Sequence, residues 1–362
     1  METAQELYRK LHRWPEPSGE ETRTAQFIFD TLSGAGYSPV RIGKTGVYAD
    51  LISDETFPWL LLRADTDALR IRECSGLPFA SENPGVMHAC GHDSHSAMLL
   101  EAAGRLIGQK LPQNIRFLFQ PAEETTLGAA EMLRCGVIPP NLRACFAMHV
   151  WPGVPEGTVA TRPGALMASS DVYKIQISGR SAHCAQSAKG LDALQTAVTI
   201  AAQLPAIRSE SSDDRTILFC GSIHSGSSHN IVPDQANLWG TLRTFSQADR
   251  SKLIGLLEKS CREAANRFGT EVQIVWDGGC PAINNDEKLI DQLRELIPGL
   301  LTQQEQTLAA EDFACYQEFA PGVLLWLGAG DVPPLHNEKF YVPERILDIG
   351  VEHWVSIAAH QW

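Results

Sequence analysis

The sequence lacks any apolar run long enough to cross a membrane, and its first residues, METAQELYRKLHRW, lack the apolar core of a signal peptide. Positive charge is also scarce, with 30 Lys and Arg against 43 Asp and Glu and a net charge of -13. This balance argues against a nucleic-acid or anionic-membrane surface, because both require a positive field. We therefore expect a soluble, cytoplasmic protein without nucleic-acid or membrane partners.

A disulfide framework is not expected either. The chain has nine Cys, an odd number, and no secretion signal. No CxxC motif is present, so a redox role for Cys90 would lack a resolving thiol. Most of these Cys are expected to be small buried apolar groups.

The pattern of apolar residues predicts two domains in this chain of 362 residues. Helices and strands alternate over the first part of the chain and again after Cys280, which is typical of an α/β domain with a mostly parallel sheet covered by helices. The expected helices are 5–14, 21–33, 94–107, 288–297 and 344–360, and the expected strands are 47–52, 59–62, 115–119, 144–150 and 323–327.

The middle of the chain has a different pattern. Its elements follow the order β-α-β-β-α-β, which is the ferredoxin-like motif. They are strand 171–178, helix 191–204, strands 216–223 and 236–245, helix 247–268 and strand 271–276. We therefore expect an α/β domain made of residues 1–167 and 280–362, with a smaller domain of residues 168–279 inserted into it.

Polar clusters follow four of the apolar strands at their C-terminal ends. RADTD follows 59–62, QPAEE follows 115–119, His149 follows 144–148 and LHN lies after 323–327, while HACGHD precedes the helix 94–107. In open α/β sheets this edge is where ligand sites form. The mixture of thiol, imidazole and carboxylate groups suits a zinc-class ion.

Each of these residues alone has a simpler interpretation. A single His149 after a strand is usually a surface or hydrogen-bonded residue. The pair Glu123 and Glu124 could favour the start of a helix, and Asp65 and Asp67 could cap turns. Five such clusters together are harder to dismiss, and we interpret them as a metal site.

The motifs also resemble a known family. LHRWPEPSGEE, LLRADTDAL, MHACGHDSHSAMLL, FQPAEE, AMHVWPG, SGRSAH, NIVPD, GTLRTF, AEDF and PLHNEKF occur in this order along nearly the whole chain. They are similar to the aminoacylase/carboxypeptidase metallohydrolases, in the amidohydrolase branch that contains hippurate hydrolases, indole-acetyl-amino-acid hydrolases and N-acetyldiaminopimelate deacetylases. HACGHD and QPAEE at this spacing are specific signals. The resemblance implies a catalytic metal-binding α/β domain and an inserted ferredoxin-like lid that forms a homodimer.

The resemblance implies a site for two divalent ions. Its ligands would be Cys90, His92, Glu124, His149 and His336, with Cys90 as the bridge between the ions. Zinc or manganese is expected, although the same ligands tolerate cobalt or nickel.

The resemblance also implies roles in catalysis. Glu123 matches the general base that takes a proton from a water held between the ions, and Asp67 matches a supporting acid. His183, in the inserted domain, matches a histidine that polarises the scissile carbonyl, often in the active site of the partner subunit. Asn230 and Arg243 match positions that meet the substrate, and Arg243 is a candidate partner for its carboxylate.

The reaction implied is hydrolysis of the amide bond of a small N-acyl amino acid, N-acetyl or aroyl, to a carboxylic acid and a free amino acid. A dipeptidase or carboxypeptidase on the same scaffold is an alternative, as is an N-acetyldiaminopimelate deacetylase. A non-catalytic binding protein is a further alternative, but the intact ligand set and Glu123 argue against it.

Two departures from the family pattern affect the pocket rim or the lid. Ser187 stands where many relatives have Pro, and Arg70-Ile71-Arg72 stand where many have Pro-Ile. His95, three residues after His92, could share its helical face as a further ligand, although a supporting or surface histidine is the simpler interpretation. The histidines expected at the surface are His12, His353 and His360.

Overall fold

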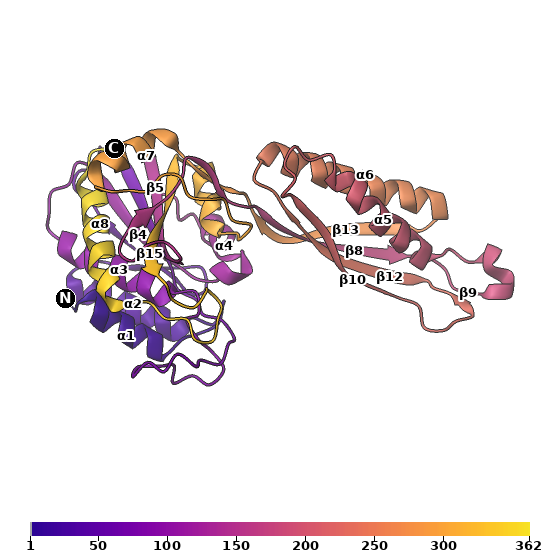
Figure 1. Cartoon of the computed structure of the whole chain (residues 1–362), viewed down its shortest axis with the longest axis horizontal. Helices are drawn as coiled ribbons and strands as arrows, with labels where there is room; N and C mark the ends of the chain where they lie inside the picture. The colour runs from indigo at the N-terminus through magenta and orange to yellow at the C-terminus, as the bar shows by residue number, and fades with distance from the viewer. Residues whose placement is uncertain (1) are drawn as a thin grey trace. The chain divides into compact units, whose positions relative to one another are not determined.

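Residues 2–362 are described by a computed structural model, in which the chain forms two compact units (Figure 1). The first unit comprises the chain up to Leu166 together with Ile283–Glu305 and Asp312–Trp362. The second unit comprises Met167–Ala282 and Gln306–Glu311. Each unit buries a hydrophobic core of its own.

The first unit is built on a seven-stranded sheet in the order β1-β2-β4-β3-β5-β15-β6. Parallel ladders join the central strands β4, β3, β5 and β15, and antiparallel ladders add β2, β1 and β6 at the two edges. The predicted α/β class with a mostly parallel sheet is therefore confirmed. The strands are β1 (Val40–Ile42), β2 (Gly46–Leu51), β3 (Trp59–Asp65), β4 (Asn114–Gln120), β5 (Leu142–Pro152), β6 (Val159–Ala160) and β15 (Gly322–Gly330).

Helix α3 (His92–Leu106) is the central helix of this unit. It packs on β3, β4 and β5 and is covered in turn by α1, α2 and α8, so its side chains are buried on nearly every side. In the part of the chain that the structure describes, no helix combines the length and apolar character needed to span a bilayer. The other helices of the unit are α1 (Ala4–Arg13), α2 (Thr22–Ala35), α4 (Gly128–Arg134), α7 (Glu287–Leu296) and α8 (Leu347–Ala359), with short 3-10 turns η1 (Glu123–Thr125), η3 (Asp312–Glu318) and η4 (Glu344–Ile346).

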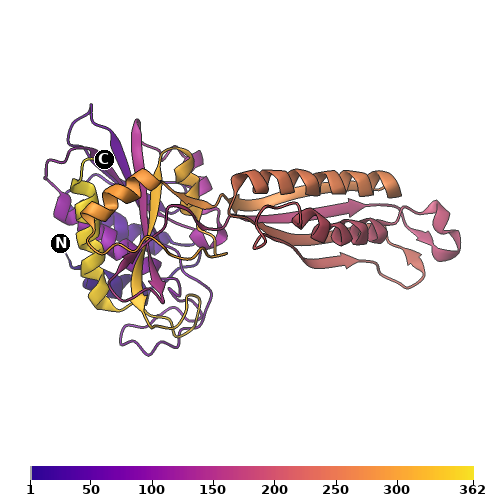
Figure 2. The ribbon, with the colours of Figure 1, turned by 45° about the horizontal axis from the view of Figure 1, so that its top comes forward.

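The second unit follows the element order β8-α5-β10-β12-α6-β13, with a four-stranded antiparallel sheet in the order β10-β12-β8-β13. Alternate strand residues face α5 and α6 and form the core with them, so both helices cover the same face of the sheet (Figure 2). The elements are β8 (Ser170–Ser178), α5 (Ala193–Arg208), β10 (Ile217–Ser225), β12 (Gln235–Arg243), α6 (Gln247–Phe268) and β13 (Glu271–Cys280), with the smaller β9 (Ala182–His183), β11 (Ile231–Val232) and η2 (Cys184–Lys189). The two-stranded sheet of β7 (Gly164–Met167) and β14 (Ile283–Asn285) belongs almost entirely to the first unit.

Strand β13 runs further than the pattern predicts. The alternation of residues ends at Trp276, yet pairing with β8 resumes at Gly279 after a bulge. Gly278 and Gly279 have φ of 76° and 146°, which glycine adopts without strain. A Cβ at Gly279 would lie 2.6 Å from Asp171 Oδ1, so the close approach of the two strands requires glycine here.

His12 lies in the core and not at the surface, so the expectation from the sequence is wrong for this residue. Only 1% of it is exposed, and its Nδ1 lies 2.6 Å from Asp93 Oδ2 and its Nε2 3.1 Å from Glu73 Oε1. Burial opposes protonation of His12, but the two carboxylates outweigh it and raise its pKa to about 9. His12 is therefore buried as part of an ion pair. Asp93 and Glu73 are far from it in the sequence, so the residue pattern of the helix that contains His12 could not predict its burial.

The His12 ion pair makes the stability of the fold depend on pH. Because the pKa rises from 6.5 to about 9 on folding, the contribution is fully present below pH 6.5 and is lost as pH rises through 9. His12→Phe is expected to lower the free energy of unfolding by about 3 kcal/mol at pH 6, since it leaves the carboxylates of Asp93 and Glu73 without the positive charge beside them. Urea unfolding at pH 6 and pH 9.5 measures this. An equal difference between the two proteins at both pH values would contradict the ion pair.

Candidate metal centre

Side chains able to bind a metal converge at the carboxyl end of the parallel strands of the first unit. Most of them reach this edge because the apolar strand before them ends there or because α3 begins there, while His149 lies within β5, which runs on to Pro152. They are Asp67 after β3, Glu123 and Glu124 after β4, His149 in β5, His336 after β15, and Cys90 and His92 at the start of α3.

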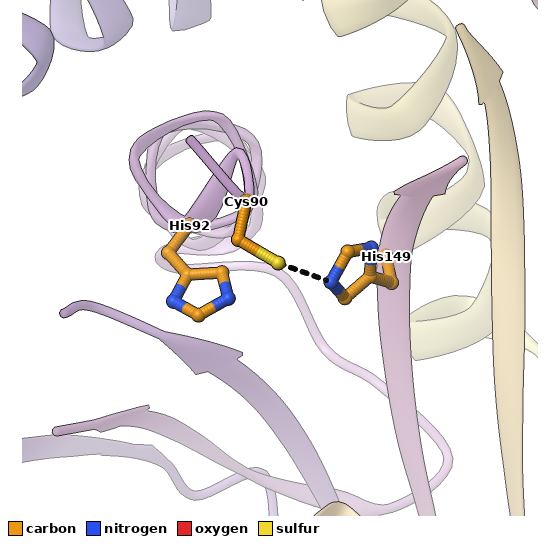
Figure 3. A group of neighbouring side chains, drawn as sticks. All are labelled: Cys90, His92 and His149. Carbon is orange, nitrogen blue, oxygen red and sulfur yellow. Dashed lines mark hydrogen bonds between the residues drawn. The ribbon is translucent and has the colours of Figure 1, made fainter. Parts of the chain in front are cut away.

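Cys90, His92 and His149 form one buried group of potential ligands (Figure 3). Their ligand atoms lie within 4.8 Å of one another, and Cys90 Sγ is 3.4 Å from His149 Nε2. Gly91 makes this group possible, because its φ of 86° turns the chain between Cys90 and His92. A Cβ at Gly91 would lie 2.5 Å from Val150 Cγ2, so a larger residue does not fit.

Cys90 also belongs to a second group, with Glu124 and His336. Glu124 Oε1 lies 3.4 Å from His336 Nε2. Two groups of candidate ligands therefore share the thiol of Cys90. Thiolate, imidazole and carboxylate are the donors that zinc-class ions prefer.

Two buried atoms within these groups have no hydrogen-bond partner among the described residues. They are His92 Nε2 and Glu124 Oε1, which lie 3.9 Å apart. Buried polar atoms are almost always paired, because an unpaired one costs the full penalty of desolvation. Cations at this place would satisfy both atoms, so the residues present fit a metal centre.

Asp67 holds His92 in the orientation that a metal ligand needs. Asp67 Oδ1 lies 2.9 Å from His92 Nδ1, and Asp67 Oδ2 accepts from Ser18 Oγ and from the backbone N–H of Glu124. With the His92 Nδ1 proton donated to Asp67, Nε2 is the nitrogen left for an ion. Ser18 stands in the LHRWPEPSGEE motif, but the motif alone implied no role for it, because only the fold brings it to Asp67.

Glu123 is placed beside the ligands by a strained turn. Ala122, just before it, has a φ of 56°, which is uncommon for a residue other than glycine. The Ala122 N–H donates to the buried carboxylate of Glu21, which therefore fixes the turn. Glu123 is buried, and its Oε2 lies 4.0 Å from His92 Nε2. Glu123 and Glu124 do not begin a long helix, since α4 starts separately at Gly128.

His336 is supplied by a loop that is held against the HACGHD segment. Its backbone N–H donates to the carbonyl of Ala89 at 2.8 Å, and its φ is 64°. Residues other than glycine seldom adopt this backbone conformation, although His does so more readily than most, and residues held in it cluster at functional sites. Its side chain is 52% exposed, in contrast to the buried Cys90 and His92.

Two of the candidate ligands, His92 and Cys90, hold a proton more firmly than usual, because their pKa values are raised. Burial opposes protonation of His92, but Asp65, Asp67 and Glu124 outweigh it and raise its pKa to about 10. Burial and the nearby carboxylates raise the pKa of the Cys90 thiol well above its usual range. An ion must therefore displace a proton from each of these two residues.

The other three candidate residues lie in the second unit, at two different ends. His183 pairs with Ile231 in the β9–β11 ladder, and the carbonyl of Asn230 accepts a hydrogen bond from Cys184 N, so His183 and Asn230 lie together. Arg243 ends β12, where it donates to the carbonyl of Leu308. The length of β12, from the end near His183 to Arg243, is about 26 Å.

The two departures from the family pattern fall outside the ligand groups. Arg70 is exposed and forms an ion pair with Glu20 at 2.6 Å. Ser187 is an exposed residue of the 3-10 turn η2. Neither residue is among the candidate ligands, so neither departure removes a metal donor.

Comparison of the sequence with known proteins identifies the family of this chain. The profile of peptidase family M20/M25/M40 matches residues 61–360, and the chain belongs to this family. It is 34% identical to the N-acetylcysteine deacetylase of Bacillus subtilis (strain 168), over 97% of this chain and 95% of the relative. It is 33% identical to thermostable carboxypeptidase 1 of Saccharolobus solfataricus, over 95% and 92% of the two chains.

A solved structure of a member of the same family is also similar to this chain. The crystal structure of a dinuclear metal-binding peptidase of the M20 family from Bacillus subtilis is similar to this chain, with a TM-score of 0.83 and 32% identity. The match covers 98% of this chain and 96% of that structure. The family resemblance predicted from the motifs is therefore confirmed.

Proposed function

We propose that this protein is a metal-dependent amidohydrolase that cleaves the amide bond of N-acyl amino acids, releasing a carboxylic acid and a free amino acid. The observation that carries the proposal is the thiol of Cys90 shared by two ligand groups, with the carboxylate of Glu123 beside them. The relative from Bacillus subtilis is named as an N-acetylcysteine deacetylase, which supports the choice of an N-acyl amino acid as the substrate.

We assign the five ligands of a two-ion centre as Cys90, His92, Glu124, His149 and His336, with zinc or manganese as the ions and cobalt or nickel as tolerated replacements. The dinuclear relative supports the number of ions. When bound, the ions supply Lewis acidity, which polarises the substrate carbonyl and acidifies water. Glu123 is the general base, positioned to take a proton from the water and deliver it to the leaving amine. Asp67 orients His92.

The second unit is, in this proposal, the ferredoxin-like lid and dimerisation domain inserted between 167 and 280. His183 lies beyond one end of β12 and Arg243 lies at its other end, and the strand itself is about 26 Å long, which is too far for one small substrate to contact both. We infer that His183 and Asn230 complete the active site of the other chain of a homodimer, where His183 polarises the carbonyl. Arg243 is the candidate partner for the substrate carboxylate.

We also propose a cytoplasmic location. All nine cysteines are free thiols, and three of them, Cys74, Cys135 and Cys184, are exposed. Exposed thiols persist in a reducing compartment.

The proposed function is tested by amine release from a panel of N-acetyl amino acids, N-benzoyl amino acids, N-acetyldiaminopimelate and dipeptides. The protein loaded with zinc or manganese is expected to release amine from N-acyl amino acids, and a chelator is expected to abolish the release. Release from dipeptides alone would replace the proposal with a peptidase, as the name of the carboxypeptidase relative would suggest. Two bound ions with no hydrolysis of any substrate would favour a non-catalytic binding protein.

A further inference from the structure

Two carboxylate–imidazole pairs lie side by side between the end of β3 and the start of α3. Asp67 Oδ1 is 2.9 Å from His92 Nδ1, and Asp65 Oδ1 is 2.6 Å from His95 Nδ1. The carboxylates are two residues apart on an extended chain and the imidazoles are three residues apart on a helix, so each spacing places its two side chains on one face. The two rings are 5.6 Å apart.

The two pairs differ at the second nitrogen of the imidazole. His92 Nε2 has no hydrogen-bond partner among the described residues, whereas His95 Nε2 accepts from the backbone N–H of Val150 at 2.9 Å. A backbone N–H only donates, so His95 Nε2 carries no proton and the ring proton is on Nδ1, donated to Asp65. Asp65, His92 and His95 lie close enough to hold an ion. Both nitrogens of His95 are engaged, however, so its interpretation as a further ligand is wrong.

Val150 needs this acceptor because β5 no longer pairs with β3 at that point, although it still pairs with β15 on its other side. The ladder between β3 and β5 ends at Arg63 and Ala147. Beyond it, the N–H of Val150 has His95 as its partner, while the carbonyl of Val150 accepts from His149 Nδ1 at 2.7 Å. The backbone of Val150 therefore contacts His95 through its N–H and His149 through its carbonyl. The other ring nitrogen of His149, Nε2, faces Cys90.

Asp65 is itself firmly anchored. Its Oδ2 accepts from Arg63 Nη1 at 2.6 Å, and its backbone carbonyl accepts from Ser96 Oγ. Arg63 also donates to Gln120 and to Asp312. All of these side chains are buried. The hydrogen bonds that hold Asp65 in place thus come from residues of β3, β4, α3 and η3.

We propose that Asp65 and His95 are positioning residues for His149. Through Val150 they set the direction of His149 Nε2, and so they determine the affinity of the ion that His149 holds. The ion held with Glu124 and His336 is not reached by this chain of contacts. This inference rests on the two-ion centre proposed above.

The test is a titration of the chelator-treated, full-length protein with Co²⁺, followed by the visible absorption of the bound ion. His149→Ala first identifies the binding step that depends on His149. His95→Phe is expected to weaken that step by about 10- to 100-fold and to leave the other step unchanged. His95→Gln is expected to restore most of the affinity, because its amide offers both an acceptor and a donor. Combining His95→Phe with His149→Ala is expected to add no further loss.

Tyr37→Phe is the matched control. It removes a buried hydrogen bond to the carbonyl of Ala103, on the same helix as His95, and should lower stability without weakening one ion selectively. If His95→Phe does not fold, Asp65→Asn is titrated in its place and should show a smaller loss at the same step.

Equal affinity of both steps in the variant and the wild type would overturn the inference, and so would equal weakening of both steps. A wild-type protein that binds fewer than two ions would instead overturn the metal centre itself.

Discussion

Glu123→Gln is expected to lower kcat for amide hydrolysis by about 10²- to 10⁴-fold while both ions stay bound, because the amide cannot accept a proton but keeps the shape of the side chain. Glu123 is buried 4.0 Å from His92 Nε2 and is absent from both groups that contain Cys90. Steady-state kinetics together with metal content by mass spectrometry measure the two effects. Near-wild-type turnover in this variant would remove Glu123 from the mechanism.

The neighbouring Glu124 provides the matched control. It carries the same charge one residue along the chain, but its Oε1 lies 3.4 Å from His336 Nε2, in one of the ligand groups. Glu124→Gln is therefore expected to lose metal first and activity as a consequence. If the two variants behaved alike, the division between a base and a ligand within the QPAEE motif would be wrong.

Cys90→Ser is expected to weaken the binding of both ions, each by at least about 100-fold. Even residues that only support a ligand cost about 10- to 100-fold when they are changed, so the loss of a shared ligand should reach or pass that upper value. The hydroxyl of Ser is also a far poorer donor to a zinc-class ion than a thiolate. Equilibrium dialysis against a series of chelator concentrations measures the affinity of each ion.

Cys145→Ser is the control for this experiment. Cys145 is also a buried cysteine, in β5, but it belongs to none of the ligand groups of the described residues. The Cys145→Ser variant is therefore expected to bind both ions as the wild type does. The loss of a single ion in Cys90→Ser would show that the thiol serves one position only and is not shared.

The sequence predicted the architecture well where the signal is local. Short apolar runs at 59–62 and 115–119 predict strands that the structure contains as β3 and β4. The polar residues that follow these runs reach the same edge of the sheet because parallel strands end together. The structure places Cys90, His92 and His149 in one group, as the motifs suggested.

The parts that the sequence could not predict depend on partners far apart in the chain. His12 is buried only because Asp93 and Glu73 meet it, and His95 is excluded as a ligand only because Val150 N–H occupies its second nitrogen. Neither contact leaves a periodic or local signature. The backbone conformation of His336 is equally a property of the folded loop.

The position of β15 has a consequence for how the protein is made on the ribosome. This strand, Gly322–Gly330, lies between β5 and β6 in the sheet, although it is synthesised long after both. The first unit therefore cannot complete its sheet, and cannot receive His336, until nearly the whole chain has emerged. Most of the second unit is one continuous stretch, Met167–Ala282, that can fold earlier. A nascent chain that stalls before β15 would keep the strand edge of β5 exposed, and such edges invite aggregation.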